Sequence, residues 1–269
     1  MVDRYAVMGN PIAHSLSPLV HRLFAEQTGD AYHYDRIKIE PNRFEQQVND
    51  FFSNQGRGLN ITLPCKKQAF CLVDNPRVRC LLGRSVNTIW FAQGKLHGDS
   101  TDGIGLIRDL TRYCHVEGKN ILLLGAGGAA SAIIEDLLAA KPAMLTVANR
   151  TYVRAKSLQL QFPQLLVVSP MALDSRYDLI INATSAYGGY WESILPSSML
   201  DNKPFCYDLR YQLDGSTDFV NWVKQYGCLA VDGLGMLVEQ AAESVLIWRG
   251  HMPNTTLILQ KIRSSSMHI

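Results

Sequence analysis

The sequence lacks any long run of like charges, and its formal net charge is only +2 over 269 residues. A chain that binds nucleic acid through its charge usually concentrates basic residues, so no nucleic-acid partner is predicted. The opening residues, MVDRYAVMGN, lack the basic and apolar regions of an export signal. We therefore expect a cytoplasmic protein.

Paired cysteines and membrane-length apolar runs are also missing. The six cysteines form no C-x-x-C pair, so we expect reduced thiols and no metal site. The longest apolar stretch, ILLLGAGGAASAIIEDLLAA, contains Glu135 and Asp136 and has several glycines and alanines in its middle. It predicts a strand, a turn and a helix, and therefore no membrane partner. The oligomeric state stays open between a monomer and a homodimer.

The composition, with 47% hydrophobic and 19% charged residues, is typical of a globular protein. The length of 269 residues suits roughly two domains. Strand-like runs alternate with helix-like segments, which predicts an α/β fold with a mostly parallel sheet and two α/β domains flanking a cleft. The substrate-binding domain is expected to comprise residues 1–103 and the returning C-terminal helices of residues 233–269. Residues 104–232 are expected to form a Rossmann-type dinucleotide-binding domain that includes a bridging helix.

A glycine-rich turn predicts a nucleotide site in the second domain. The run ILLLGAGGAA spells G-x-G-x-x-A with Gly125, Gly127 and Ala130, after a strand and before a helix. Gly125 permits a tight turn, Gly127 lets the backbone approach a pyrophosphate, and Ala130 allows close helix–sheet packing. The free N–H groups at the helix start would bind the phosphates. A purely structural glycine turn is the alternative interpretation.

The end of the next strand predicts which dinucleotide binds. An NAD site usually places an acidic residue there for the ribose 2′-hydroxyl, whereas this chain has Arg150 and Arg154 with Thr151 between them. A guanidinium suits a 2′-phosphate, so NADP is favoured over NAD. The alternative is a solvated turn, because arginine is common on protein surfaces.

The stretch GLNITLPCKK predicts a half-buried strand in the first domain. Leu59, Ile61 and Leu63 would lie on its apolar face, and Thr62 on the opposite face. Pro64 would end the strand, directly before two lysines.

Polar side chains gather at other expected strand and helix ends of the first domain. Ser17 is expected to be the N-cap of a helix whose first residue is Pro18, with Ser15 beside it. Two hydroxyls near free backbone N–H groups can bind a carboxylate. Further polar residues of this block are Asn60, Thr62, Lys66, Lys67, Asn87, Thr88 and Asp102. Together with a nicotinamide, this inventory suggests hydride transfer to the carbonyl of a small polyhydroxylated acid.

Several motifs, in order along nearly the whole chain, resemble those of the shikimate dehydrogenase family: GNPIAHSLSPLVH, GLNITLPCKK, SVNT, GDSTDGIG, GAGGAA, NRTYVRA, INATSA, YDLRY and DGLGMLVEQAAES. The resemblance implies reversible NADPH-dependent reduction of 3-dehydroshikimate to shikimate, a step toward chorismate and the aromatic amino acids. It implies Lys66 and Asp102 as the catalytic pair. The substrate-binding residues that it implies are Ser15, Ser17, Thr62, Asn87, Tyr211 and Gln240. The cofactor-binding residues that it implies are Gly125, Ala126, Gly127, Gly128, Ala129, Asn149, Arg150, Thr151, Arg154, Leu209 and Gly233.

The implied catalytic pair has a physical rationale. Negative charge develops on the carbonyl oxygen when hydride arrives, and the Lys66 ammonium can stabilise that charge and deliver a proton. Asp102 can orient Lys66 and bond a neighbouring substrate hydroxyl. Lys67 is expected to be a solvated residue in the first turn of the next helix.

The chain departs from the family pattern at several positions. Arg84 and Ser85 precede VNT where the family usually has glycine and alanine, Ser100 replaces asparagine, and Tyr187 replaces glycine. The proline that usually follows Tyr211 is missing.

Two rival functions remain open at this point. One is a related dehydrogenase that acts on quinate or an amino analogue with NAD, although the arginine pair disfavours NAD. The other is a ligand-binding regulator that keeps the fold without chemistry, because a fold alone does not determine function. The presence of both Lys66 and Asp102 disfavours the regulator.

Overall fold

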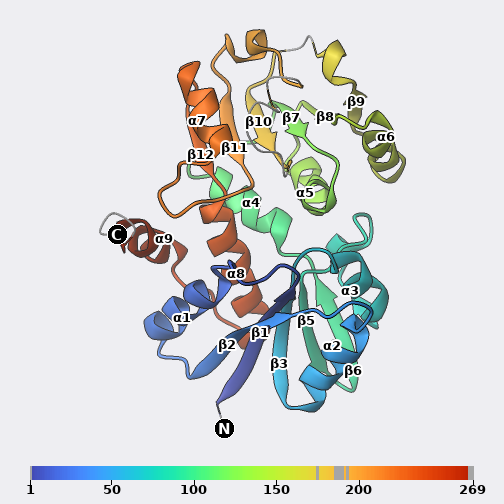
Figure 1. Cartoon of the computed structure of the whole chain (residues 1–269), viewed down its shortest axis with the longest axis vertical. Coiled ribbons are helices and arrows are strands. Elements are labelled where there is room, and N and C mark those ends of the chain that lie inside the picture. The colour runs from blue at the N-terminus through green and yellow to red at the C-terminus, as the bar shows by residue number, and fades with distance from the viewer. Residues whose placement is uncertain (1, 174–175, 185–190, 192–193, 266–269) are drawn as a thin grey trace. The chain divides into compact units, whose positions relative to one another are not determined.

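The computed structural model describes residues 2–173, 176–184, 191 and 194–265. The chain forms two compact units (Figure 1): unit 1 is Met1–Gly105 with Leu237–Gln260, and unit 2 is Leu106–Met236 with Lys261–Ile269. The functional domain boundaries given above stay a prediction. Among the described residues, no helix combines the length and the apolar character needed to cross a bilayer.

Unit 1 is built on a mixed sheet whose strand order is β2-β1-β3-β5-β6-β4. Its strands are β1 (Asp3–Gly9), β2 (Tyr32–Lys38), β3 (Gly56–Ile61), β4 (Asn75–Pro76), β5 (Thr88–Ala92) and β6 (Lys95–Asp99). Its helices are α1 (Ser17–Thr28), α2 (Phe44–Ser53), α3 (Lys66–Leu72), the 3₁₀ turn η1 (Val78–Cys80), the first part of α4 (Asp102–Leu110), most of α8 (Leu234–Arg249) and the first part of α9 (Thr255–Ser265).

The expectation of a mostly parallel sheet overlooked a hairpin in unit 1. β1 pairs in parallel with β2 and β3, but β5 is antiparallel to both β3 and β6. Gln93 and Gly94 connect β5 to β6 with φ values of 54° and 76°, the left-handed pair typical of a two-residue hairpin turn. The glycine between two strand-like runs was the available signal. The hairpin matters because β6 leads directly into the start of α4.

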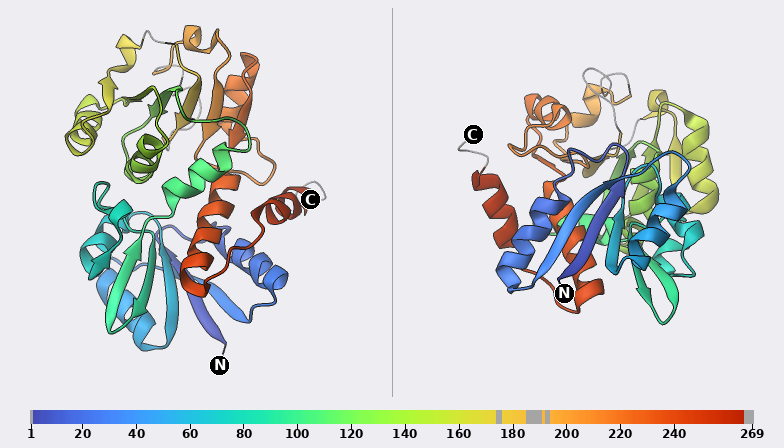
Figure 2. Two further views of the ribbon diagram at one scale, coloured as in Figure 1. Left: turned by 180° about the vertical axis from the view of Figure 1, so that it is seen from behind. Right: turned by 60° about the horizontal axis from the view of Figure 1, so that its bottom comes forward.

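The strand β3 is buried on both faces, so the prediction that it is half-buried is wrong. Leu59 and Ile61 lie in the apolar core with side chains of α2 and α3, whereas Asn60 is buried on the other face. Tyr5 of β1 stacks on Trp248 of α8 with ring centroids 4.8 Å apart, which places α8 over that second face (Figure 2). Leu63 lies beyond the strand end and is exposed.

The start of α1 differs from the prediction by one residue. The helix begins at Ser17 itself, and Leu16 occupies the N-cap position. The backbone N–H of Ser17 lies 3.3 Å from Ser15 Oγ and donates to it. Ser15, rather than Ser17, therefore satisfies one of the orphan donors at this helix start.

Unit 2 contains a parallel sheet in the order β12-β11-β10-β7-β8-β9. Its strands are β7 (Asn120–Leu124), β8 (Met144–Ala148), β9 (Leu166–Val168), β10 (Leu179–Asn182), β11 (Phe205–Asp208) and β12 (Ala230–Asp232). Its helices are the last part of α4, α5 (Gly128–Ala139), α6 (Tyr152–Gln161), α7 (Asp218–Gln225), the 3₁₀ turns η2 (Pro170–Ala172) and η4 (Ser197–Leu200), the start of α8 and the last part of α9. Read from β9, this is the doubly wound order of a dinucleotide-binding domain.

Helices cover both faces of the unit 2 sheet (Figure 1). Ile121 and Leu123 of β7 pack in one apolar cluster with side chains of α5. Leu122 and Leu124 pack in a second cluster with side chains of α7. Strands buried on both faces in this way read as continuous apolar runs, as the residues Ile121 to Leu124 of β7 do.

Candidate active site

Lys66 and Asp102 form an ion pair in unit 1. Lys66 is the first residue of α3 and Asp102 the first residue of α4, so both side chains project from helix starts. The distance from Lys66 Nζ to Asp102 Oδ2 is 2.5 Å, and the side chains are only 17% and 10% exposed. An ion pair partly withdrawn from water keeps its geometry and interacts strongly with a charge that develops nearby.

Asn87 connects this ion pair to the helix α8. Its Nδ2 lies 3.0 Å from Asp102 Oδ1, 2.9 Å from Thr101 Oγ1 and 3.3 Å from Gln240 Oε1. Its Oδ1 accepts the backbone N–H of Thr101 at 2.8 Å, which orients the amide. The Asp102 carboxylate thus contacts Lys66 through one oxygen and Asn87 through the other. Lys66, Asn87, Asp102 and Gln240, each expected to act in the site, therefore meet in one network.

Thr101 and Ser244 belong to the same network but were not among the site residues predicted from the sequence. Ser244 Oγ donates to the Gln240 carbonyl at 3.1 Å and lies 3.0 Å from Thr88 Oγ1. The signal for Ser244 was its position four residues after Gln240, on the same face of a helix. The signal for Thr101 was its place beside Asp102.

Asn60 links the network to Tyr34 of β2. Its Nδ2 donates to Ser244 Oγ at 3.0 Å, and its Oδ1 accepts the Tyr34 hydroxyl at 2.7 Å. The imidazole of His21 stacks on the Tyr34 ring with centroids 3.8 Å apart. Burial lowers the pKa of His21 to about 3, so the ring is neutral near pH 7.

Ser15 and Ser17 form the expected pair of hydroxyls. Their Oγ atoms are 3.2 Å apart, and Arg36 donates to the Ser15 carbonyl at 2.7 Å and 3.0 Å. Thr62 follows β3 directly, and its backbone N–H donates to the Met8 carbonyl at 2.9 Å. Ser17 is thus the first residue of α1 and Ser15 lies just before it, whereas Thr62 lies at the carboxyl ends of the neighbouring strands β1 and β3.

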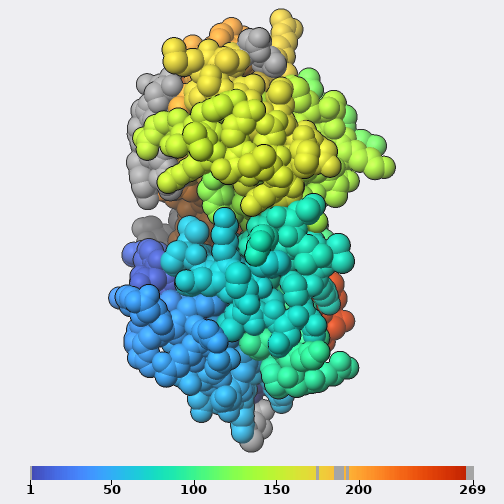
Figure 3. Space-filling model, turned by 90° about the vertical axis from the view of Figure 1, so that its right-hand side faces the viewer, coloured from blue at the N-terminus to red at the C-terminus, as the bar shows by residue number. Residues whose placement is uncertain are grey.

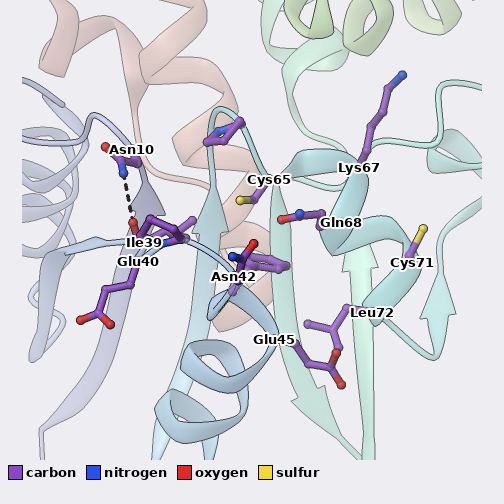
Figure 4. A pocket seen from close by; sticks show the side chains of 13 residues that line it. Asn10, Ile39, Glu40, Asn42, Glu45, Cys65, Lys67, Gln68, Cys71 and Leu72 are labelled. Atoms are coloured by element: carbon purple, nitrogen blue, oxygen red, sulfur yellow. Dashed lines mark hydrogen bonds between the residues drawn. The ribbon is translucent and has the colours of Figure 1, made fainter.

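The two lysines of the CKK run have different surroundings. Lys67 is exposed and lies at the rim of a cavity of about 920 Å³ on unit 1, whereas Lys66 is not among its lining residues (Figure 4). In that view the Lys67 side chain extends away from the cavity, while Gln68 points toward it. In Figure 3 the teal residues of α3 and the segment that follows it lie at the surface of unit 1. The solvated position predicted for Lys67 is therefore confirmed.

Three of the departures from the family pattern, at Arg84, Ser85 and Ser100, lie in the described part of unit 1. Arg84 has a φ of 45° and is exposed, with its guanidinium carbon 5.5 Å from the centroid of the Phe70 ring. Ser85 and Ser100 are both buried, and the Ser100 backbone N–H donates to Asp99 Oδ1 at 2.8 Å. Tyr187 lies outside the described residues.

The glycine-rich turn of unit 2 lies where the sheet order reverses, between β7 and β10. Gly125 has a φ of 110°, and a Cβ there would lie 3.0 Å from the Ala183 carbonyl oxygen. Gly127 is the N-cap of α5, and a Cβ there would meet no described atom within 4 Å. Ala130 is buried against the sheet. Ala126, Gly128 and Ala129 complete the turn and are partly or fully exposed. Dinucleotides bind at such a switch point, and these residues fit a pyrophosphate.

The residues after β8 face solvent. Arg150, Thr151 and Arg154 are exposed, and Asn149 Nδ2 donates to the Thr151 carbonyl at 2.9 Å. Thr151 precedes α6 as its N-cap residue. Arg150 thus lies in the turn that receives the adenosine ribose in this fold, and Arg154 lies in the first turn of the helix α6 that follows.

Leu209 and Gly233 lie side by side after β11 and β12. A Cβ at Gly233 would come within 2.5 Å of the Leu209 carbonyl oxygen, so only glycine permits this approach. Below them, Asp208 accepts from Asn182 Nδ2 at 2.9 Å and from Thr217 Oγ1 at 2.7 Å. Burial raises the pKa of Asp208 to about 6, against the effect of these hydrogen bonds. Tyr211 belongs to unit 2, so its place in a substrate pocket stays a prediction.

Unit 2 has a doubly wound sheet with a glycine turn at its switch point. Unit 1 is a separate α/β unit with a lysine–aspartate ion pair. Together these features define a protein of the nucleotide-dependent dehydrogenase class. Residues 7–89 match the family model described as shikimate dehydrogenase substrate binding domain. Residues 109–203 match shikimate / quinate 5-dehydrogenase, and residues 233–263 match shikimate 5′-dehydrogenase C-terminal domain. The chain belongs to the shikimate dehydrogenase family.

Individual relatives agree with this assignment. A shikimate dehydrogenase (NADP(+)) of Legionella pneumophila (strain Lens) is 53% identical over 264 residues, covering 98% of this chain and 100% of its own. The shikimate dehydrogenase of Aquifex aeolicus is 30% identical with a TM-score of 0.89, covering 97% of this chain and 98% of its own. The shikimate 5-dehydrogenase of Thermus thermophilus, solved with NADP(H) and shikimate, is 29% identical with a TM-score of 0.86, covering 98% and 99% of the two chains. The predicted α/β fold with a Rossmann-type domain is thereby confirmed.

Proposed function

We propose that this chain is a shikimate dehydrogenase that reversibly reduces 3-dehydroshikimate to shikimate with NADPH, in the pathway to chorismate and the aromatic amino acids. The observation that carries the proposal is the Lys66–Asp102–Asn87 network of unit 1. It occurs in a chain that is 53% identical to an NADP-dependent relative over nearly its whole length. The regulator alternative is disfavoured because such a protein has no need of an ammonium and a carboxylate 2.5 Å apart.

NADP is the cofactor, and the turn after β7 fits it. Gly125 to Ala129 would hold the pyrophosphate against the start of α5, where Gly127 leaves room for it. The adenosine end would be held by Asn149, Arg150, Thr151 and Arg154. Leu209 and Gly233 would lie beside the nicotinamide. When bound, NADPH supplies the hydride.

The substrate would be oriented by hydroxyl and amide groups. The Ser15 and Ser17 hydroxyls, 3.2 Å apart beside the start of α1, would donate to its carboxylate. Thr62, Asn87 and Gln240 would bond its ring hydroxyls, and Tyr211 would line the same pocket. Asn87 is suited to this role because the Thr101 N–H already fixes which way its amide points.

Lys66 would move the proton. Its Nζ would donate to the substrate carbonyl oxygen as negative charge develops there, and would take the proton back in the reverse direction. Asp102 would hold Lys66 through Oδ2 and bond a neighbouring substrate hydroxyl. The Asn87 amide on Oδ1 keeps the carboxylate from rotating away.

The cellular setting is part of the proposal. A cytoplasmic location suits a biosynthetic enzyme that draws on NADPH, and reduced thiols are consistent with it. The protein would act as a monomer or a homodimer.

Absorbance of reduced nicotinamide tests the function. Purified protein with shikimate and NADP should produce NADPH, and activity with quinate or with NAD should be much weaker. Turnover with quinate and NAD that equals or exceeds turnover with shikimate and NADP would overturn the substrate and cofactor assignment.

A further inference from the structure

The segment after β11 carries Leu209 and Tyr211, and several bonds hold its backbone. The Leu209 N–H donates to the Asn182 carbonyl at 2.9 Å, and the Arg210 N–H donates to Asp208 Oδ1 at 3.1 Å. The Arg210 carbonyl accepts the Gly233 N–H at 2.8 Å. These bonds tie the first half of the segment to the neighbouring strand ends.

The second half of the segment is held by one side chain from the C-terminal helix. Arg263 of α9 donates through Nη1 to the carbonyls of Gln212 and Leu213, at 2.6 Å and 2.9 Å. Its Nη2 forms an ion pair with Asp232 Oδ1 at the end of β12.

Asp232 contacts both Arg263 and the loop. Its carboxylate is buried, and its second oxygen, Oδ2, accepts the Gln212 N–H at 2.9 Å. The N–H and the C=O of Gln212 are therefore both bonded, to Asp232 and to Arg263. A proline at position 212 would have no N–H for this bond, so the missing proline noted above is compatible with a different means of holding the loop.

We propose that Arg263 is a positioning residue, which acts through Gln212 and Leu213 to hold the adjacent Tyr211 in place for the substrate. A guanidinium suits this task because its rigid fork can serve two carbonyls and a carboxylate at once. A small displacement of a positioned group lowers the catalytic rate strongly even when the reacting groups are intact. The inference rests on the proposed function for the role of Tyr211, but the Arg263 contacts themselves do not.

The test compares three variants in the full-length chain. Arg263→Ala should raise the Michaelis constant for shikimate roughly tenfold and lower kcat several-fold, because the loop is released. Arg263→Lys should recover part of the loss, since an ammonium keeps the charge that pairs with Asp232 but lacks the rigid planar fork that directs N–H groups to the carboxylate and the two carbonyls. Ile262→Val is the matched control: Ile262 is buried in the same helix, so this change weakens packing while leaving the Arg263 contacts in place.

Hydrogen exchange of the peptide covering residues 209–217 supplies a readout that needs no activity. Arg263→Ala should speed exchange there at least tenfold relative to wild type, and Ile262→Val should leave it near the wild-type rate. Equal Michaelis constants and equal exchange for Arg263→Ala and Ile262→Val would overturn the positioning role. A wild-type protein that does not oxidise shikimate would overturn the proposed function instead, and the exchange result would still decide whether Arg263 holds the loop.

Discussion

Units 1 and 2 hold their candidate functional groups in different ways. In unit 1 the polar side chains bond to one another: Lys66 to Asp102, Asp102 to Asn87, and Asn87 to Gln240. In unit 2 the residues expected to bind nucleotide, such as Arg150 and Arg154, are exposed at the strand ends.

This difference separates two kinds of contribution to the reaction. A network of buried, mutually oriented groups is preorganised, so it can stabilise charge that develops in a transition state. Exposed cations on a turn instead add binding energy for a ligand charge that is the same in ground and transition states. We therefore expect substitutions in unit 1 to act mainly on kcat, and substitutions in the arginine turn to act mainly on the cofactor's Michaelis constant.

The largest effect is expected at Lys66. Lys66→Ala should lower kcat by about 10² to 10⁴, the usual contribution of general acid–base catalysis, with a modest rise in the Michaelis constant for shikimate. Lys67→Ala is the matched control, because the neighbouring ammonium is exposed and should contribute little. Steady-state measurements of kcat for both variants test this prediction. A larger loss of kcat in Lys67→Ala than in Lys66→Ala would mean that the catalytic lysine has been assigned wrongly by one residue.

The sequence predicted the Lys66–Asp102 pair but not the network around it. The pair lies in two recognisable motifs, whereas Ser244 and Asn60 meet only because α8 packs across the sheet from a distant part of the chain. The same limit explains β3, which reads as half-buried because Asn60 is polar, although α8 covers that face. A polar residue that is buried and hydrogen-bonded looks like a surface residue when only its neighbours in sequence are known.

The second effect in size concerns the cofactor. Arg150→Ala should raise the Michaelis constant for NADPH roughly ten- to hundredfold, because a hydrogen bond to a charged group contributes about 1.5–3 kcal/mol. The Michaelis constant for NADH, which has no 2′-phosphate, should stay unchanged in the same variant and serves as the control. The constant for dehydroshikimate should also change little. An unaltered value for NADPH would refute the role of Arg150 and weaken the contrast between the units.

Acid should destabilise unit 1 through His21. Its pKa is lowered to about 3 in the folded chain, so below about pH 6.5 the unfolded chain takes up a proton that the folded chain refuses. Stability is therefore lost as the pH falls, by up to about 1.4 kcal/mol per pH unit for this one group. Urea unfolding of wild type and His21→Phe at pH 7, 6 and 5 measures it. The free energy of unfolding of wild type should fall relative to that of His21→Phe as the pH falls. If the two free energies changed in parallel with pH, this account would be contradicted.

Asp208 should give unit 2 a pH dependence of the opposite sign. Its pKa is raised to about 6 from an unfolded value of about 3.9, so between these values the folded chain keeps a proton that the unfolded chain loses. Raising the pH through this window then weakens wild type relative to Asp208→Asn, whose amide does not titrate. The hydrogen bonds lost in the variant add a constant offset and leave the slope unaffected. If the wild-type free energy of unfolding instead rose relative to Asp208→Asn between pH 4 and 6, the bonds from Asn182 and Thr217 would outweigh burial.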